Sequence, residues 1–218
     1  MAQLQLYDID PLQPLSAVLG GYIICHQCDV VGRFGAAVPW PCPACGVENV
    51  VSRAYFPMQV LSLVDLMQQQ RWLALSIGGA PPWANKGAEL ATVNYFCALQ
   101  EALLRHLLKR LMVRKGLANE EQRDLFDKAR GRRRMAELFQ TLTAVPLDRA
   151  VAELEAEEGW EFLGEVAKAR NGFLHSGIEW SGPLAPSCVN EVGRLLKLFV
   201  ELHNRYLVSV GLAPGASP

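Results

Sequence analysis

The spacing of hydrophobic residues changes near residue 57 of this chain. Upstream, the short apolar runs Tyr22–Ile24 and Val47–Val51 are typical of β-strands. Downstream, apolar residues recur every three or four positions, which predicts amphipathic helices. The expected helices cover Met58–Ile77, Ala88–Lys115, Gln122–Leu142, Val151–Leu174 and Val189–Val210. The third of these could be two helices, and the fourth could be interrupted at Gly159. The fold class is therefore mainly α, with a small N-terminal β module ahead of an up-down helical bundle.

The predicted helices have recognisable ends and inward faces. Gly116 and Gly177 are expected to end the second and fourth helices, and a loop rich in glycine and proline follows the first. The final helix carries the most regular apolar stripe of the chain. That stripe consists of Val192, Leu195, Leu196, Phe199, Leu202, Tyr206 and Val210.

Four cysteines form two CxxC pairs within the predicted β module. Cys25 and Cys28 make the first pair, Cys42 and Cys45 make the second, and thirteen residues separate the pairs. A tight turn in each pair brings both sulfurs to the same side, so four thiolates can surround one metal ion. This pattern predicts a zinc ribbon with one structural Zn²⁺ per chain, because four sulfur ligands leave no open position for a substrate.

Other interpretations of the cysteines are an iron–sulfur cluster and a dithiol redox pair, which the spacing favours less. His26 lies between two predicted ligands and is expected to be a surface residue rather than a fifth ligand. Cys97 and Cys188 stand alone and are expected to be small buried residues. The only bases of the ribbon are Arg33 and Arg53, too few to indicate that the ribbon itself binds nucleic acid.

These patterns divide the chain into four parts. We expect a zinc ribbon with an N-terminal arm over 1–56, a connecting helix and loop over 57–86, a helical bundle over 87–212 and a disordered tail over 213–218.

Two charged residues fall on apolar faces of the predicted helices. When Trp160–Leu174 is wound at 100° per residue, Arg170 lies in the middle of the apolar half. Glu101 lies among the apolar residues of the Ala88–Lys115 helix. Because an unpaired buried charge is costly, we expect these two side chains to pair. Such a pair could set the register of the helices or take part in chemistry.

A second face of the same helix carries two polar groups. Asn171 and His175 are four residues apart, so an arginine, an amide and an imidazole occur within the hexapeptide that begins at Arg170. RNA cleavage can use such a set, because the imidazole can transfer protons near neutral pH and the guanidinium can neutralise phosphate charge.

The overall charge of −1 argues against wholesale coating by nucleic acid, but it hides an asymmetry. Arg105–Arg134 holds eleven basic and four acidic residues, whereas Asp148–Glu165 holds seven acidic residues and one arginine. These segments could be two solvated helix faces that partly attract each other. Alternatively, the basic segment could guide RNA beside an acidic surface that excludes nonspecific nucleic acid.

The composition is that of a globular protein, with half the residues apolar and a fifth charged. No signal peptide is evident, and no uncharged apolar stretch approaches the ~18 residues that a membrane span requires. We therefore expect a cytoplasmic protein with no membrane partner. No phosphate-binding glycine loop or dinucleotide fingerprint is present.

The sequence from Arg170 to His175, late in a helix with another long helix after it, resembles the HEPN superfamily. Members are small all-α bundles, and many are metal-independent endoribonucleases whose hallmark is an Arg, four to six residues, then a His. The resemblance covers about Ala88–Val210 and implies that Arg170, Asn171, His175 and Glu101 are the catalytic residues. It also implies the setting of a toxin or an antiviral defence effector, with a neutralising partner protein.

The resemblance implies cleavage through the 2′-OH of RNA, which leaves a 2′,3′-cyclic phosphate and a 5′-OH. His175 would move the proton, Arg170 would stabilise the transition state, and Asn171 would orient the phosphate or the imidazole. On one ideal helix, however, Arg170 and His175 point ~140° apart. They converge only if the helix deforms near Gly172 or if two chains share the site. We therefore expect a two-fold homodimer in which both motifs line one cleft.

A non-catalytic interpretation competes with this one. His175 could simply interact with the C-terminal dipole of its helix, and Arg170 could be only an ion-pair partner. Some HEPN proteins do not cleave RNA and act as RNA-binding, protein-binding or dimerising modules. The alternative function is thus a zinc-ribbon and HEPN module that binds and dimerises without catalysis.

Overall fold

A computed structural model describes residues 21–33, 39–51, 53–76, 82–177 and 184–208. Within these ranges the chain has seven helices and two small antiparallel hairpins, which confirms the mainly α class with an N-terminal β module. The strands are β1 (Tyr22–Ile24), β2 (Val31–Arg33), β3 (Trp40–Pro41) and β4 (Glu48–Asn49). The helices are α2 (Met58–Ser76), α3 (Pro82–Arg114), α4 (Asn119–Lys128), α5 (Arg132–Thr143), α6 (Leu147–Ala152), α7 (Glu157–Ser176) and α8 (Leu184–Leu207).

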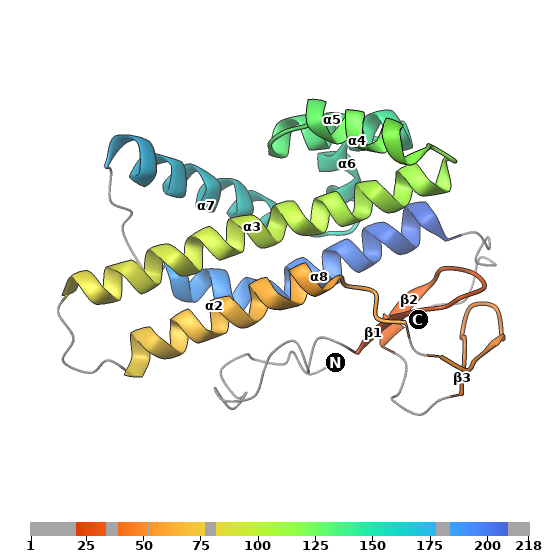
Figure 1. Ribbon diagram of the computed structural model, residues 1–218, viewed down its shortest axis with the longest axis horizontal. Helices are drawn as coiled ribbons and strands as arrows, with labels where there is room; N and C mark the ends of the chain where they lie inside the picture. Colours follow the sequence, from red (N-terminus) through yellow and green to blue (C-terminus); the bar gives the residue numbers. More distant parts are fainter. Residues whose placement is uncertain (1–20, 34–38, 52, 77–81, 178–183, 209–218) are drawn as a thin grey trace.

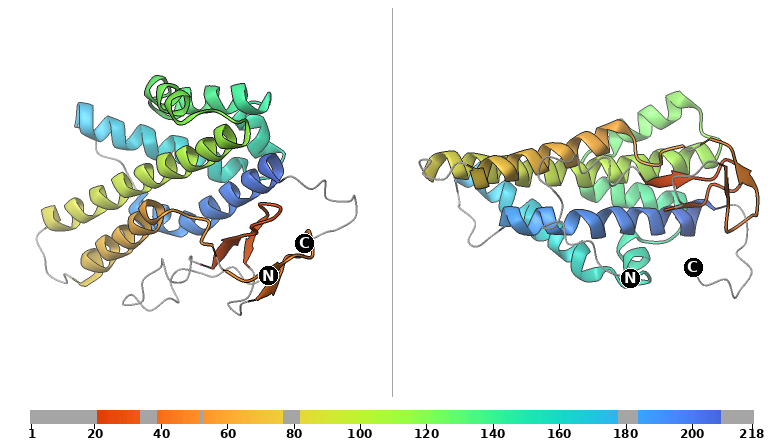
Figure 2. Two further views of the ribbon diagram at one scale, coloured as in Figure 1. Left: turned by 45° about the vertical axis from the view of Figure 1, so that its right-hand side comes forward. Right: turned by 90° about the horizontal axis from the view of Figure 1, so that it is seen from below.

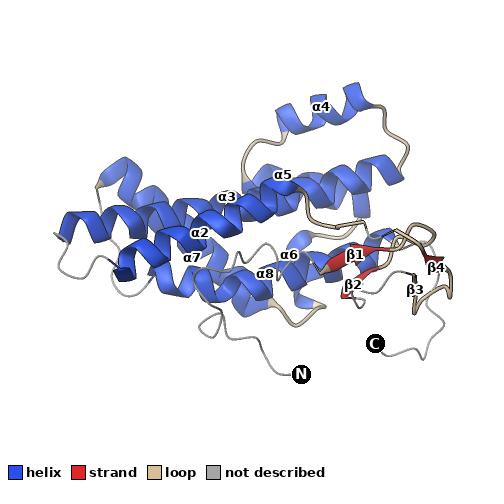
Figure 3. Ribbon diagram, turned by 60° about the horizontal axis from the view of Figure 1, so that its bottom comes forward, coloured by secondary structure: helices blue, strands red, loops and turns tan. Residues whose placement is uncertain are grey.

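Three long helices form the body of the molecule. Helix α3 packs against both α2 and α8, while α7 and the group α4–α6 cover another side of α3 (Figure 1). The two hairpins lie together at one end of this body, beside the C-terminal half of α8 (Figure 3). The last turn of α7 lies at the opposite end, as two further views show (Figure 2).

The apolar stripes predicted for the two longest helices form the core. In α8 the residues from Val192 to Leu202 of the predicted stripe are buried, Tyr206 is half-buried, and Val210 lies outside the described residues. In α3 the apolar side chains that belong to the core cluster are Val93, Phe96, Cys97, Leu99, Ala102, Leu103, Leu104, Leu107, Leu108, Leu111 and Met112. These helices pack through their apolar faces because burial of that surface is the main favourable term in folding.

The segment predicted as a connecting helix contributes to the same core. Val60, Leu61, Val64 and Met67 of α2 are buried in one cluster with the residues of α3 and α8. Leu73, predicted to point inward, is instead 38% exposed. Three predicted features fall outside the described residues. They are Ile77, the tail over 213–218 and, up to Pro82, the glycine-rich break after the first helix.

The boundary between α6 and α7 differs from the predicted position. Gly159 lies inside α7, so the interruption expected there is wrong; the chain leaves the helix over Glu153–Ala156 instead. Glu155 adopts a left-handed conformation with φ of 54°, which ends the preceding turn. At its other end α7 stops at Gly177, as predicted, because Gly177 takes the left-handed conformation with φ of 64°.

The β module is not a separate body. Ile24, Val31, Tyr55 and Phe56 belong to the hydrophobic cluster of the helices, while the side chains nearest the cysteines form a small cluster of their own. The hairpins therefore have one face on the bundle and another around the cysteines.

Candidate metal centre and the arginine–histidine helix

The two CxxC pairs sit in turns of the same geometry. In the first, Cys25 donates its backbone N–H to Val30 O at 2.9 Å and accepts one from Asp29 at 3.2 Å. In the second, Cys42 donates to Val47 O at 2.9 Å and accepts from Gly46 at 2.8 Å. Each pair thus presents two sulfurs from one compact turn, as its spacing predicted.

Each turn requires a left-handed residue directly after its second cysteine. Gly46 meets this requirement in the second turn, with φ of 72°. Asp29 occupies the equivalent position of the first turn with φ of 63°. Aspartate is one of the few residues besides glycine that adopts this conformation, so an aspartate directly after the second cysteine is itself a sequence signal for this turn.

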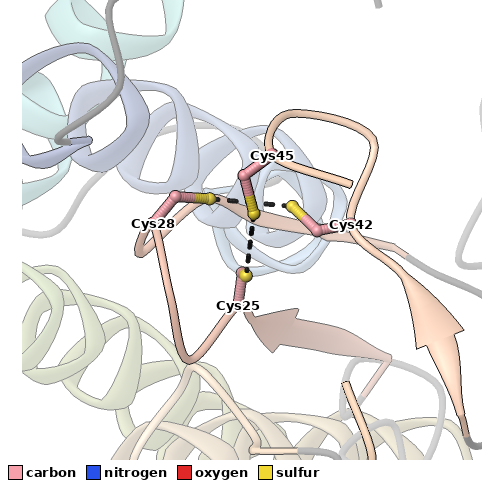
Figure 4. A group of neighbouring side chains, drawn as sticks. All are labelled: Cys25, Cys28, Cys42 and Cys45. Atoms are coloured by element: carbon pink, nitrogen blue, oxygen red, sulfur yellow. Dashed lines mark hydrogen bonds between the residues drawn. The ribbon is translucent and has the colours of Figure 1, made fainter. Parts of the chain in front are cut away.

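The four sulfurs lie close together and face one another (Figure 4). All four are within 4.8 Å of each other, with 3.8 Å between the Sγ atoms of Cys25 and Cys45 and 3.6 Å between those of Cys28 and Cys42. A tetrahedral ion with metal–sulfur bonds of about 2.3 Å requires sulfurs about 3.8 Å apart. The residues present therefore fit one metal ion with four thiolate ligands.

A buried asparagine supports this cluster from the side. Asn49 is fully buried, and its Nδ2 donates to Cys25 Sγ at 3.6 Å and to Val47 O at 3.2 Å. Its Oδ1 accepts the backbone N–H of His26 at 3.1 Å and lies 2.7 Å from His26 Nδ1. His26 is exposed, as predicted, and its Nδ1 is engaged by Asn49. Asn49 therefore joins the two metal turns and orients one ligand.

The thiols have shifted pKa values. Burial raises the pKa of Cys28 and of Cys42. Burial also acts to raise the pKa of Cys25, but backbone N–H groups at Cys28 and Gln27 and the Asn49 amide outweigh it and lower this pKa to about 6. Hydrogen bonds to a thiolate stabilise its charge, so Cys25 is prepared for the ionised form that a metal ligand must have.

One histidine fixes the first metal turn to the bundle, and a second packs on the same tyrosine ring. His203 of α8 is fully buried and donates from Nε2 to Asp29 O at 2.8 Å. Its ring and that of His106 on α3 both stand edge-on to Tyr55, with centroids 4.8 Å and 4.9 Å away. Arg110 lies 3.6 Å from the Asp29 carboxylate. The sequence identified no role for these histidines, because the contacts join residues far apart in the chain.

The hexapeptide that begins at Arg170 lies on one uninterrupted helix. Helix α7 continues through Gly172 to Ser176, so the deformation that would bring Arg170 and His175 together within one chain is not present. Arg170 is half-buried, whereas Asn171 and His175 are exposed. His175 lies in the last turn of α7. Within one chain these groups therefore point apart, at the ~140° of an ideal helix.

The predicted pairing of Glu101 with Arg170 is wrong. Glu101 is exposed rather than buried, and the described residues include no ion pair between these two side chains. The helical wheel placed Glu101 near Cys97 and Leu104, both of which are buried. A carboxylate at the edge of such a stripe can turn to water, so its position on the wheel did not determine its burial.

The guanidinium of Arg170 lies next to Cys97 instead. Burial raises the pKa of Cys97, while the charge of nearby Arg170 acts in the opposite direction. Arg170 Nε is buried and has no hydrogen-bond partner among the described residues. Cys97 and Cys188 are both buried and free, as predicted for isolated cysteines.

A second arginine, which sequence reasoning did not single out, packs against the N-terminal part of α7. Arg132 at the start of α5 donates to Trp160 O at 3.2 Å and stacks over the Trp160 ring at 4.3 Å. The indole Nε1 of Trp160 donates to Asp148 Oδ1 at 2.6 Å. Burial lowers the pKa of Arg132, and the charges of Asp148 and Cys97 partly offset that effect.

The basic and acidic segments are held mainly by local contacts. Arg130 pairs with Asp127 and Arg133 with Glu137 inside the basic segment, and Arg149 pairs with Glu153 inside the acidic one.

A cavity of about 300 Å³ lies between α7 and α8. It is lined by Glu158, Gly159, Phe162, Ser187, Asn190, Glu191 and Arg194 and includes none of the predicted catalytic residues.

None of the described helices is long and apolar enough to cross a membrane. Comparison of the chain with protein-family models, with curated proteins and with solved structures yields no match. The candidate sites therefore stand on their own geometry: a four-cysteine metal centre at one end of the bundle and the helix with Arg170 and His175 at the other.

Proposed function

We propose that this protein is a metal-independent endoribonuclease of HEPN type that uses Arg170 and His175. The observation that carries the proposal is the half-buried guanidinium of Arg170, which has an unpartnered Nε and no carboxylate ion pair among the described residues. A charge held in this way is costly unless an anion meets it, and the RNA phosphate is such an anion. His175 is exposed on the following turns and accessible to a substrate.

The proposed reaction needs no cofactor. His175 accepts the proton of the ribose 2′-OH or donates one to the departing 5′ oxygen, and Arg170 neutralises the negative charge that grows on the phosphorus oxygens. Asn171, exposed beside them, orients the phosphate. The products are a 2′,3′-cyclic phosphate and a 5′-OH. Glu101 is retained only as an exposed group near Cys97, and it forms no ion pair with Arg170 among the described residues.

We further propose that two chains form the site as a two-fold homodimer. The straight course of α7 supports this, because Arg170 and His175 cannot both face one phosphate within a single chain. In a two-fold arrangement, Arg170 of one chain faces His175 of the other. Leu174, which is 49% exposed between them, is an apolar residue that such an interface would cover.

The four-cysteine cluster is proposed to hold one Zn²⁺ in a structural role. The sulfur distances suit a tetrahedral thiolate site, and its four ligands leave no position for a substrate. The hairpins lie at the end of the bundle away from the last turn of α7 (Figure 1). The ribbon therefore braces α3 and α8 rather than contacting a substrate held at the Arg170 end.

The divergence of Arg170 and His175 also favours an alternative function. A chain that keeps both residues on a straight helix can bind RNA or a protein and dimerise without cleaving anything. In this alternative His175 interacts with the helix C-terminus, and Arg170 binds a phosphate or an acidic side chain. The same settings, a toxin or a defence effector with a neutralising partner, apply to either function.

Cleavage can be tested with the purified, zinc-loaded protein. Structured and single-stranded RNAs are incubated separately with the wild type, His175→Ala and Ser176→Ala. Each incubation is repeated at several low concentrations of a metal chelator, and the zinc bound to the protein is measured each time. We expect cyclic-phosphate products from the wild type and from Ser176→Ala, the neighbouring exposed control, and none from His175→Ala. Equal amounts of product from all three preparations would indicate a contaminating ribonuclease. If no preparation cleaves RNA, the alternative function, a module that binds without catalysis, is supported instead.

A mixing experiment tests the shared site. Arg170→Ala and His175→Ala are inactive alone if both residues are required. When the two variants are mixed and exchange subunits, half of the dimers are mixed and each has one intact site, so activity returns to about a quarter of the wild-type level. No recovery despite proven subunit exchange would rule out a site built from Arg170 of one chain and His175 of the other.

A further inference from the structure

The last turns of α3, the whole of α4 and the first turn of α5 lie together and form one surface. Arg105 of α3 stacks over Phe126 of α4, with its Cζ atom 5.6 Å from the ring centroid. Near the end of α4, Arg134 of α5 donates from Nη1 to Lys128 O at 3.3 Å. Helices α4 and α5 stand beside the C-terminal half of α3 (Figure 1). The basic segment of the sequence is therefore one surface of the molecule, here named the α4 surface (residues 105–134).

The α4 surface carries a large excess of exposed positive charge. It holds eleven basic and four acidic residues. Six of the basic side chains are exposed and form no ion pair within the described parts of the chain: Arg105, Lys109, Lys115, Arg123, Lys128 and Arg134. Arg130 and Arg133 do form ion pairs, but both pairs are exposed, and pairs of this kind hold their members only weakly.

The acidic residues of the α4 surface are engaged near their own positions. Glu121 accepts the backbone N–H of Ala118 at 2.7 Å and so caps the start of its own helix. Asp127 lies 3.6 Å from the guanidinium of Arg130. Glu120 also lies in the first turn of α4, where the helix dipole stabilises a negative charge. These carboxylates therefore leave the six exposed cations without a partner on the same surface.

The acidic segment 148–165 does not neutralise these cations either. Asp148 accepts an indole N–H, and Glu153 pairs with two arginines outside the α4 surface. The two segments do attract each other at the half-buried Arg132, whose pKa burial lowers and the charge of Asp148 partly restores. Among the described residues, however, no ion pair joins the α4 surface to the acidic segment. The six exposed cations can therefore meet a polyanionic partner.

We propose that the α4 surface binds the phosphate backbone of single-stranded RNA without regard to base sequence. Guanidinium and ammonium groups spread over several turns suit this partner, because each can neutralise a phosphate and release a bound counterion. The inference rests on the proposed function for its choice of RNA, and it deepens that function by naming where the substrate is held. The last turn of α7 lies at the opposite end of the chain (Figure 2). The α4 surface therefore holds a part of the RNA away from the bond that is cleaved.

Binding is measured by fluorescence anisotropy on the full zinc-loaded chain. The probe is a single-stranded 2′-O-methyl RNA, which resists cleavage because its 2′ oxygen is blocked. The test variant combines Arg123→Gln with Lys128→Gln on α4. The control variant combines Arg194→Gln with Lys197→Gln, which removes two exposed cations from α8, so both variants lose the same net charge.

We expect the α4 variant to bind the RNA about tenfold or more weakly than the wild type at about 0.1 M salt, and the α8 variant within about threefold. The slope of log affinity against log salt should flatten by about 1.4 in the α4 variant, at about 0.7 for each lost phosphate contact, and stay unchanged in the α8 variant. Equal losses in both variants would overturn the proposal, because they would indicate attraction to net charge alone.

A polyglutamate chain with the same number of charges tests the choice of partner. We expect it to bind the wild type more weakly than the RNA does at the same salt concentration, because guanidinium groups on this surface can each donate two hydrogen bonds to one phosphate. Binding as tight as that of RNA would overturn the proposal and identify an acidic protein segment as the partner.

Lysine modification of the wild type covers the case in which a variant loses its fold. The acetylation rates of Lys109, Lys115 and Lys128 are compared with and without saturating RNA, and Lys197 on α8 is the reference. We expect the RNA to slow acetylation of the first three lysines and to leave that of Lys197 unchanged. If RNA is bound and none of the three is protected, the RNA binds elsewhere and the proposal is wrong.

The inference and the proposed function fail separately. His175→Ala should bind the 2′-O-methyl RNA as the wild type does and yet leave unmodified RNA intact. If no preparation cleaves RNA but binding depends on Arg123 and Lys128, the α4 surface stands and the ribonuclease does not. If RNA is cleaved and the α4 variant binds and cleaves like the wild type, the ribonuclease stands and the role of the α4 surface is wrong.

Discussion

Asn204 and Val31, 173 positions apart in the chain, form two hydrogen bonds of 2.8 Å. The Val31 N–H donates to Asn204 Oδ1, and Asn204 Nδ2 donates to Val31 O. One side chain of α8 therefore completes the backbone pairing of strand β2, as a neighbouring strand would. Together with the bond from His203 to Asp29 O, this contact joins the metal turn to the end of the bundle.

Replacing Asn204 should destabilise the junction. In Asn204→Ala, both backbone groups of the buried Val31 lose their partner, which costs about 1–3 kcal/mol for each group left without water. We expect a lower free energy of urea unfolding for zinc-loaded Asn204→Ala. Asn171→Ala, which removes an exposed asparagine from α7, serves as the control and should differ from the wild type by less than about 0.5 kcal/mol. Equal values for the two variants would contradict the assigned role of Asn204.

Removal of the metal should loosen one end of the molecule only. Without an ion, the four sulfurs lose the bonds that hold the two turns together, and the contacts of Asp29 and Val31 with α8 weaken. Hydrogen exchange should therefore accelerate in β1, β2 and the last turns of α8 after chelation. The last turns of α7, at the other end, should exchange at an unchanged rate (Figure 2). Uniform acceleration along the chain would show that the ribbon supports the whole bundle.

Gly46 should be sensitive for a backbone reason alone. Its φ of 72° is unfavourable for residues with a Cβ, and an added Cβ would meet nothing within 4 Å. Gly46→Ala should therefore cost about 1 kcal/mol, and Gly46→Asn less, because asparagine tolerates the left-handed conformation. Zinc competition with a chromophoric chelator measures the resulting loss of zinc affinity.

Gly193, an open position within α8, serves as the control. Gly193→Ala should raise the free energy of unfolding by up to about 1 kcal/mol, and a lower free energy of unfolding would contradict the backbone argument.

The buried histidine His203 should make stability depend on pH. Burial lowers its pKa from 6.5 to about 4, an effect that a hydrogen bond with the backbone of Asp29 partly opposes. The unfolded chain therefore takes up the proton first as the pH falls. Stability should be complete above about pH 6.5 and decline toward pH 4, by about 3 kcal/mol at full protonation.

His203→Gln tests this origin of the pH dependence, because glutamine keeps a donor for Asp29 O and does not titrate. Urea unfolding between pH 7 and pH 4.5, with zinc content monitored at each pH, should give a shallower decline for the variant than for the wild type. An identical decline would assign the effect to other groups, such as the thiolates or His106, whose pKa burial also lowers to about 4.

The local features of this protein follow directly from its amino-acid sequence. Helical periodicity predicted the mainly α fold and the buried stripes of α3 and α8, because a residue that faces the core recurs every three or four positions. The CxxC spacing predicted the four-cysteine cluster, because two residues between cysteines suit a single tight turn. Gly177 ended α7 as predicted, because glycine adopts the left-handed conformation without strain.

Which of these features contact one another depends on how the helices pack. A helical wheel gives the direction of Glu101 and Arg170 but not what covers them, so their predicted pairing was wrong and Arg170 lies beside Cys97. The meetings of Arg132 with Trp160 and of Asn204 with Val31 depend on how whole helices pack. Contacts between distant segments leave no periodic trace in the chain, because packing and not spacing brings them together.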